Sequence, residues 1–311
     1  MNPAERTVLL TGASGFVGTP SLAALLAQGF RVHAVSRHAC ATRPEGVTWH
    51  TADLLDPAAR RHLIETARPT HLLHLAWYVE HGKFWTAPEN EHWVAASLDL
   101  LNLFAAHGGR RAVFTGSCAE YDWARQNDIP FRETDPCRPQ TPYGRAKLDL
   151  MEQASKLSEG AGLSFAWARF FLMFGYGEDR RRLIPSIIHG LLSKQNVALS
   201  SGRQIRDFFD TRDIGTALAA LLAADNVTGA LNVASGRAVT LRAMGAMLAE
   251  ISQMPESLLQ FAKLPDREGE PRYLVADVAR LTGEVGFKPA ATLEERLAQC
   301  LDWHRAAVQH P

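Results

Sequence analysis

Tyr143 and Lys147, four residues apart, are the side chains in this sequence best suited to acid–base chemistry. Residues four apart on a helix lie on one face, so the phenol and the ammonium share a pocket if the segment is helical. Lowering the pKa of a tyrosine from about 10 to about 7 requires roughly 4 kcal/mol, which one positive charge about 4 Å away supplies at an effective dielectric constant of about 20. We therefore expect Lys147 to make Tyr143 an acid or base near neutral pH.

Ser117 is the third candidate catalytic residue. It directly follows the apolar segment Arg111–Gly116, which is typical of a buried strand. A hydroxyl at the end of such a strand can hydrogen-bond a substrate oxygen alongside the phenol. Tyr-x-x-x-Lys alone occurs by chance on many exposed helices, so Ser117 is what strengthens the prediction of a catalytic site.

Glycines mark the turn between the first expected strand, Thr7–Thr11, and the first expected helix, Phe16–Gln28. Their Gly-x-x-Gly-x-x-Gly spacing permits a tight turn, lets the backbone approach a pyrophosphate, and allows the helix to pack on the strand. The helix N-terminus then offers free N–H groups and a partial positive charge to the phosphates. The sequence therefore predicts dinucleotide binding. The residues expected to make these contacts are Gly12, Ser14, Gly15, Phe16, Val17 and Gly18.

The end of the second expected strand indicates which dinucleotide is bound. NAD enzymes usually carry an acid there for the ribose 2′-hydroxyl, but this sequence has Ser36 and Arg37. These two side chains suit a 2′-phosphate, so we expect NADP(H) to be preferred, with NAD(H) as the alternative. Asp53, after the third strand, is placed to meet the adenine amino group. The other residues expected beside the cofactor are Leu54, Leu75 and Ala76.

Short apolar segments alternate with helical ones through the first half of the chain. This alternation predicts an α/β, Rossmann-type, doubly wound parallel sheet with its site at the carboxyl ends of the strands. We expect residues 1–172 to form the dinucleotide-binding domain, rejoined by about 206–236, and residues 173–205 and 237–311 to form a smaller α/β substrate-binding lobe. The other expected strands and helices are Arg31–Ser36, Val47–Ala52, Pro57–Ala67, His71–Trp77, Trp93–Ala106, Tyr143–Glu159, Ser164–Phe171, Ile184–Leu192, Ala217–Ala224, Gly229–Val233 and Leu293–Trp303.

Together the glycine loop, Ser117, Tyr143 and Lys147 resemble the extended short-chain dehydrogenases/reductases, the NAD(P)-dependent nucleotide-sugar epimerase, dehydratase and reductase family. The resemblance implies that Ser117 and Tyr143 bind the sugar oxygen, that Lys147 bonds the nicotinamide ribose, and that Arg206 and Arg267 lie near the substrate diphosphate. It also implies a homodimer formed through the helices Trp93–Ala106 and Tyr143–Glu159. The further motifs that carry it are His74-Leu75-Ala76, Arg206-Asp207-Phe208, Asn232-Val233-Ala234-Ser235-Gly236 and Arg267-Glu268-Gly269-Glu270.

The residues after Ser117 narrow the reaction. The family's 4,6-dehydratases have Asp-Glu there, whereas this sequence has Cys118 and Ala119, and Glu120 is one residue too far along an extended segment. Enzymes that epimerise and then reduce carry a cysteine two residues after the serine, so we interpret Cys118 as a packed side chain. Two reactions at C4 of the sugar remain. The absent acid after the second strand favours a 4-ketoreductase acting on a nucleotide-linked 4-keto-6-deoxy sugar. The alternative is a 4-epimerase with tightly bound NAD, and a third hypothesis is a regulator that binds NADP without turnover.

Aromatic residues are concentrated after the fourth strand, in the segment Trp77–Trp85, and again at Tyr121-Asp122-Trp123. Such rings stack on the C–H faces of sugars, and Trp77 is our candidate for substrate contact. The alternative is that they pack between lobes or in a dimer contact. Leu172 and Trp93 depart from the family pattern, because many members have asparagine at these positions.

Composition excludes several other classes of protein. With 33 basic and 33 acidic residues in 311, the charge is balanced and gives no reason to expect nucleic acid or an anionic membrane as a partner. No apolar run reaches the roughly 18 residues of a membrane helix, and the short segment before the first strand leaves no room for a signal peptide. The cysteines and histidines show no metal-ligand spacing, so we expect no metal and a cytoplasmic protein with reduced thiols. The cysteines are Cys40, Cys118, Cys137 and Cys300.

Overall fold

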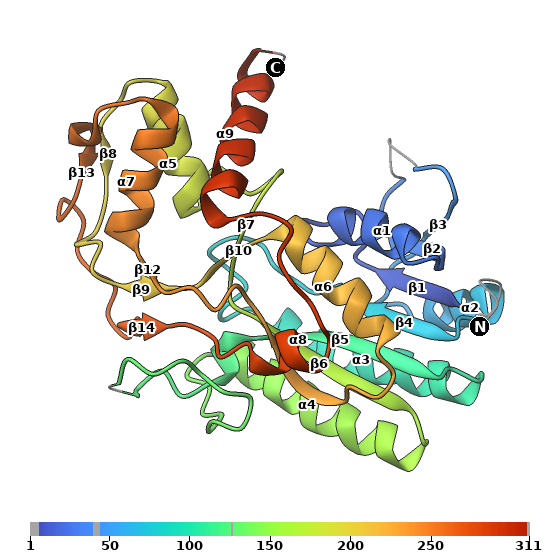
Figure 1. Ribbon diagram of the computed structural model, residues 1–311. Coiled ribbons are helices and arrows are strands. Elements are labelled where there is room, and N and C mark those ends of the chain that lie inside the picture. Colours follow the sequence, from blue (N-terminus) through green and yellow to red (C-terminus); the bar gives the residue numbers. More distant parts are fainter. Residues whose placement is uncertain (1–5, 40–43, 126, 310–311) are drawn as a thin grey trace.

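The computed structural model describes residues 6–39, 44–125 and 127–309, so Cys40 lies outside it. Within these ranges the centre of the molecule is a seven-stranded parallel sheet in the order β11-β6-β5-β4-β1-β2-β3 (Figure 1). This confirms the predicted Rossmann-type fold. The strands are β1 (Thr7–Thr11), β2 (Arg31–Ser36), β3 (Val47–Thr51), β4 (His71–His74), β5 (Arg111–Ser117), β6 (Ser164–Phe170) and β11 (Gly229–Val233).

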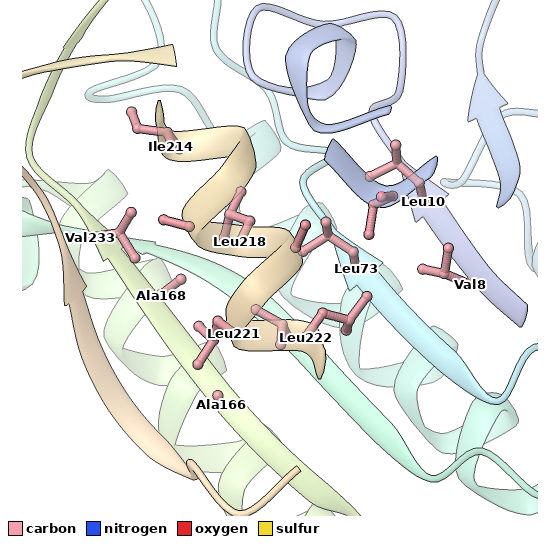
Figure 2. Close-up of a cluster of buried hydrophobic side chains, with 14 of the residues drawn as sticks. Val8, Leu10, Leu73, Ala166, Ala168, Ile214, Leu218, Leu221, Leu222 and Val233 are labelled. Atoms are coloured by element: carbon pink, nitrogen blue, oxygen red, sulfur yellow. The ribbon is translucent and has the colours of Figure 1, made fainter. Parts of the chain in front are cut away.

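Helices cover both faces of the sheet. Successive side chains of a strand point to opposite faces, and β1 is apolar on both. Val8 and Leu10 belong to the buried cluster beneath α6 (Figure 2), whereas Leu9 belongs to the cluster on the other face. One face carries α1 (Gly18–Ala27) and α6 (Thr211–Ala223). The other carries α2 (Pro57–Ala67), α3 (Glu89–Ala106) and α4 (Pro142–Gly160).

A third buried cluster joins α5 (Leu183–Leu192), α7 (Leu241–Ser252) and α9 (Leu293–Gln309), which lie beyond the carboxyl edge of the sheet (Figure 1). Short strands link this part to the sheet, and the division into two lobes stays a prediction. The remaining elements are η2 (Cys118–Glu120), β7 (Leu172–Phe174), β8 (Val197–Ala198), β9 (Ile205–Arg206), β10 (Phe208–Asp210), β12 (Val239–Thr240), η3 (Glu256–Leu258), β13 (Leu259–Gln260), β14 (Tyr273–Leu274) and α8 (Ala279–Gly283).

The predicted boundaries agree best where a cap defines them. Asp56 accepts a hydrogen bond from the Ala58 N–H at 2.9 Å, and α2 begins at Pro57 as predicted. The fourth strand was expected to reach Trp77 but ends at His74. Helix α7 was not predicted. No helix in the described part of the chain combines the length and the apolar character that crossing a membrane requires.

Candidate active site

The loop after β1 requires glycine for two different reasons. Gly12 has a φ of 67°, and a Cβ atom there would lie 2.9 Å from the backbone nitrogen of Ala76. A Cβ atom at Gly18 would lie 2.0 Å from the carbonyl oxygen of Gly12. Ser14 and Gly15, between them, are exposed. The loop is therefore pressed against the end of β4 and the start of α1, with its backbone open toward solvent.

This loop lies at the point where the strand order reverses, because β1 pairs with both β2 and β4. Thr11, the last residue of β1, has its hydroxyl 2.8 Å from Nδ1 of His74 and accepts hydrogen bonds from the N–H groups of Leu75 and Ala76. These bonds end β4 early, because they replace the pairing of a longer strand. Nε2 of His74 lies 2.8 Å from Ser97 Oγ. Burial lowers the pKa of His74 to about 3, so this network is neutral.

The other predicted cofactor residues lie at the same edge, after β2 and β3. Ser36 is buried and donates its hydroxyl hydrogen to the carbonyl of His38 at 2.7 Å, while Arg37 is exposed. Asp53 is also exposed and accepts a hydrogen bond from the Leu55 N–H at 2.9 Å. Leu54 is part of the core beneath α2. The contacts of these residues with a dinucleotide stay predictions.

Ser117 and Tyr143 meet where β5 ends and α4 begins. Thr141 caps α4 by accepting a hydrogen bond from the Gly144 N–H at 3.1 Å, which makes Tyr143 the second residue of the helix. A Cβ atom at Gly144 would lie 2.4 Å from the carbonyl oxygen of Ala119, so glycine allows the helix to approach the segment after Ser117. Burial raises the pKa of the Tyr143 phenol, and a hydrogen bond with the Ser117 side chain opposes that rise.

Lys147 is buried one turn further along α4, but it does not contact the phenol. Its Nζ donates to the carbonyl of Thr115 at 2.8 Å and lies 3.6 Å from the centroid of the Trp77 ring, compared with 6.0 Å for the Tyr143 ring. Burial lowers the pKa of Lys147 to about 7, and the charge of Glu120 acts in the opposite direction. The predicted acidification of Tyr143 by Lys147 is therefore absent here, because burial of the phenol dominates and the ammonium is directed elsewhere.

The two predicted aromatic segments come together around Tyr143. The rings of Phe84 and Trp85 contact the Tyr143 ring edge-on, with centroid distances of 4.9 and 5.6 Å. Trp123 in turn lies 6.0 Å from Trp85, ring centroid to ring centroid. The predicted substrate residue Trp77 is held by a 2.8 Å hydrogen bond from its Nε1 to the side-chain oxygen of Asn90. One wall of the site is therefore aromatic.

The two predicted diphosphate residues are near each other but differ in exposure. Arg206 is 2% exposed and pairs with Glu270 at 2.9 Å, in the loop that carries Arg267. Arg267 is exposed and lines a cavity of about 520 Å³ together with Arg203, Gln204 and Glu270. The charge of Arg206 lowers the pKa of Cys118, beside Ser117, although burial raises that pKa overall to about 12. Arg206 is therefore paired with a residue that lines the cavity, and its charge reaches the residue beside Ser117.

The two departures from the family pattern are both packing residues. Leu172 opens β7, pairs in register with Phe208 of β10 and packs on two apolar clusters. Trp93 is 6% exposed, and its ring centroid lies 6.2 Å from that of Trp77. Apolar contacts therefore replace the polar ones that asparagine would make at these positions.

Sequence reasoning missed Glu120, Arg169 and Arg182. Glu120 and Arg169 form a buried ion pair, with the Arg169 Nε 2.7 Å from the Glu120 carboxylate. The signal was available in the sequence, since each interrupts an otherwise apolar segment. Arg182 precedes α5, lies 3.2 Å from the buried carboxylate of Glu178, and lowers the pKa of Tyr143 through its charge. In the described ranges no group of three or more His, Cys, Asp or Glu side chains is placed to hold a metal ion.

Comparison with known proteins gives a consistent result. Residues 8–234 match the NAD dependent epimerase/dehydratase family. The UDP-glucose 4-epimerase of Rhizobium leguminosarum bv. trifolii is 25% identical, over 99% of this chain and 100% of its own length. A dTDP-6-deoxy-L-talose 4-dehydrogenase (NAD(P)(+)) of Kitasatospora kifunensis is 27% identical over 95% of each chain. A solved structure of MoeE5 with UDP-glucose and NAD is 28% identical, with a TM-score of 0.84 over 97% of this chain and 99% of that one. UDP-glucose 4-epimerases recur among the other relatives of 22–26% identity.

Proposed function

The chain belongs to the NAD dependent epimerase/dehydratase family, and from that premise we propose that it inverts C4 of a nucleotide-linked sugar, as a 4-epimerase. The family that the sequence motifs indicated is confirmed, and the chain is an NAD-dependent enzyme of the sugar-nucleotide type. The 4-ketoreductase was the main prediction from sequence and the epimerase its alternative. The relatives favour the epimerase, since UDP-glucose 4-epimerases predominate among those cited above.

The observation that carries this proposal is the hydroxyl pair of Ser117 and Tyr143 at the carboxyl edge of the sheet, close to the glycine loop. The two positions after Ser117, where a dehydratase needs acids, hold a buried alanine and a buried thiol whose pKa is about 12. Neither Cys118 nor Ala119 can exchange a proton near neutral pH. The site is therefore equipped to move one proton and one hydride at a single carbon, and not to eliminate water.

The residues at this edge fit a dinucleotide. Any side chain at Gly12 or Gly18 would collide with backbone, and the N-terminus of the ten-residue helix α1 follows directly. The glycine loop would hold the pyrophosphate, and Leu75 and Ala76 would line the crevice. When bound, NAD supplies the group that accepts a hydride from C4 and returns it.

The protein side chains have separate tasks in the proposed reaction. Tyr143 takes the proton of the C4 hydroxyl during oxidation and gives it back during reduction. Ser117 donates a hydrogen bond to the same oxygen and stabilises the carbonyl that forms. Lys147 bonds the nicotinamide ribose from its buried position one turn along α4. The aromatic wall of Phe84, Trp85 and Trp123 excludes water and contacts the sugar ring.

Arg206 and Arg267 are proposed to bind the diphosphate of a sugar nucleotide. The MoeE5 structure contains UDP-glucose, so UDP-sugars are the first substrates to test. Helices α3 and α4 pack on each other, and the homodimer expected through them stays a prediction that light scattering tests.

The test is to incubate the purified protein with UDP-glucose, UDP-N-acetylglucosamine and their C4 epimers and to follow the anomeric protons by NMR. We expect interconversion without added or consumed NAD(P)H, and a loss of about a thousandfold in kcat for Tyr143→Phe. The opposite result, stoichiometric NADPH oxidation with a 4-keto sugar nucleotide and no interconversion, assigns the chain as a 4-ketoreductase.

The 4-ketoreductase is the second candidate because of one feature, the absence of an acid at the end of β2. Ser36 and Arg37 suit NADP(H), which a reductase consumes, and the Kitasatospora dehydrogenase uses NAD(P). Mass spectrometry of the dinucleotide that co-purifies separates the two, since retained NAD favours the epimerase. A regulator would bind the dinucleotide and show no Tyr143-dependent turnover.

A further inference from the structure

Glu120 is a fully buried carboxylate directly beneath the proposed reaction site, three residues after Ser117. Its oxygens accept hydrogen bonds from the Ser117 N–H at 2.7 Å, from Trp167 Nε1 at 3.0 and 3.1 Å, and from Arg169 Nε at 2.7 Å. A buried charge is tolerated only when it is paired and hydrogen-bonded, and this one is. None of the roles assigned above uses it.

The first consequence of this arrangement is a fixed Ser117. Its N–H is held by Glu120, and its Oγ accepts a hydrogen bond from the Ala119 N–H at 3.2 Å, so the two side chains cap the short helix η2 reciprocally. Backbone and hydroxyl of Ser117 are both constrained. A shorter side chain at position 120 would free the backbone of Ser117, and the Ser117 hydroxyl would then no longer have a fixed direction.

The carboxylate itself cannot turn away. Arg169, 1% exposed, donates to Glu120 through Nε while its Nη1 donates to the Tyr121 hydroxyl at 3.2 Å and to the Glu133 carbonyl at 3.1 Å. The room for this packing comes from Gly116, where a Cβ atom would lie 2.4 Å from Glu120 Oε1 and 2.0 Å from Trp167 Nε1. The buried carboxylate of Glu120 therefore requires the glycine at position 116, which leaves the space that the carboxylate occupies.

The second consequence concerns the charge of Lys147. The Trp167 ring, whose Nε1 donates to Glu120, has its centroid 5.9 Å from the Lys147 Nζ. Glu120 raises the pKa of Lys147 and that of Tyr143 through its charge. Other titratable or charged groups interact with Glu120 or Lys147, and they lie on several elements packed around the two residues. These groups are His74 of β4, Cys118 of η2, Tyr121 after η2, Cys137 before α4, Tyr143 of α4 and Arg169 of β6.

We propose that Glu120 is a positioning residue, which holds Ser117 aligned with Tyr143 and supplies a buried negative charge to Lys147 from beneath the site. The proposal rests on the function proposed above. It adds a buried anion that the catalytic residues themselves do not reveal. Glu120 does not touch substrate or cofactor, and it acts through Ser117 and Lys147 alone.

The charge role is tested without any assay of turnover. The chain has only six lysines, so protein labelled with ¹³C at the lysine ε-carbon gives few signals, and Lys147→Arg identifies the one from Lys147. In the wild type this signal should titrate near pH 7. Glu120→Gln removes the negative charge, so the midpoint should fall by half a pH unit or more, whereas Glu120→Asp should leave it close to the wild-type value. Equal midpoints for the wild type and Glu120→Gln overturn the charge role.

The alignment role is tested by kinetics. Both Glu120→Gln and Glu120→Asp should lower kcat at least tenfold with KM for the sugar nucleotide within about threefold. Because Glu120 raises the pKa of both Tyr143 and Lys147, the whole pH–rate profile of Glu120→Gln should move to lower pH. Asp213→Asn is the matched control, because it breaks another buried ion pair, in which the Asp213 carboxylate lies 2.6 Å from the Arg296 guanidinium. This variant should have a lower Tm and an unchanged pH–rate profile.

The outcomes separate this inference from the proposed function. A wild-type protein without C4 activity contradicts the proposed function, and the lysine titration still decides the charge role of Glu120. An active wild type, together with a Glu120→Gln variant that loses only Tm and keeps its profile and its Lys147 midpoint, makes Glu120 a structural residue and overturns the proposal.

Discussion

The two ends of the site are built by opposite means. At the proposed dinucleotide end, the space exists because Gly12 and Gly18 have no side chains. At the proposed reaction end, aromatic rings pack against Tyr143, and Glu120 of a buried ion pair holds the Ser117 N–H. One end depends on backbone geometry, the other on charged and aromatic side chains buried at a cost.

This difference determines how each end tolerates change. The glycine loop should lose dinucleotide binding when any side-chain atom is added to it, whereas the reaction end should lose activity when an atom or a charge is removed. Buried polar networks also couple their members, so substitutions at the reaction end should have effects beyond the residue that is changed. The predictions that follow test this contrast, beginning with the largest effect.

Lys147→Met should change the pH dependence of stability more than any other single substitution at the reaction end. The folded pKa of Lys147, about 7, lies below that of the unfolded chain, so the unfolded state binds more protons between pH 7 and about pH 10.5. The free energy of unfolding of the wild type should therefore rise over this interval by on the order of 4 kcal/mol from this group, and the variant should lack that rise.

Denaturant unfolding at pH 6.5 and pH 9.5 measures this difference. Lys156→Met, which removes an exposed lysine from the same helix, serves as the control and should keep the wild-type pH dependence. Parallel stability curves for the wild type and Lys147→Met would show that the ammonium is solvated after all.

Ser117→Ala should lower kcat by roughly a hundredfold, the usual loss when one donor to a developing oxyanion is removed. Ser117→Thr keeps the hydroxyl and should retain most of the activity. Steady-state rates with the sugar nucleotide check both variants. An alanine variant as active as the threonine variant would remove Ser117 from the reaction end.

Gly12→Ala should act on the other end, weakening dinucleotide binding at least tenfold. The new Cβ atom combines a strained positive φ with a 2.9 Å contact to the Ala76 backbone, at a cost of about 1–3 kcal/mol. Gly29→Ala has the same backbone strain, with φ at 78°, but no atom within 4 Å of its Cβ. Titration of NAD(H) into both variants separates the two costs, since only Gly12→Ala should lose affinity.

The contrast between the two ends also explains what the sequence could reveal. The glycine loop is a contiguous motif between a strand and a helix, so its position, its fold context and the edge of the sheet were predictable. The Tyr143–Lys147 spacing indicated the proposed reaction end, because residues four apart on a helix share a face.

What the spacing could not reveal was the direction of each side chain. Lys147 points to Trp77 and Thr115, and Glu120 lies beside Trp167 and Arg169, and each of these contacts joins residues 32 to 70 positions apart in the sequence. Such contacts depend on how strands and helices pack, which a local pattern does not contain. Burial, decided by the same packing, reversed the expected shift of the Tyr143 pKa.

The smallest effect is expected at Arg37, which sharpens the dinucleotide end. Arg37 is exposed at the end of β2, where a 2′-phosphate would distinguish NADP(H) from NAD(H). Arg37→Ala should weaken NADPH binding about tenfold, the worth of one charge-assisted hydrogen bond, and leave NADH binding nearly unchanged. Arg31→Ala, at the exposed opposite end of the same strand, removes an equal charge and should alter neither affinity. If the ratio of the two dissociation constants is the same in Arg37→Ala as in the wild type, Arg37 is a solvated surface residue that does not set the dinucleotide preference.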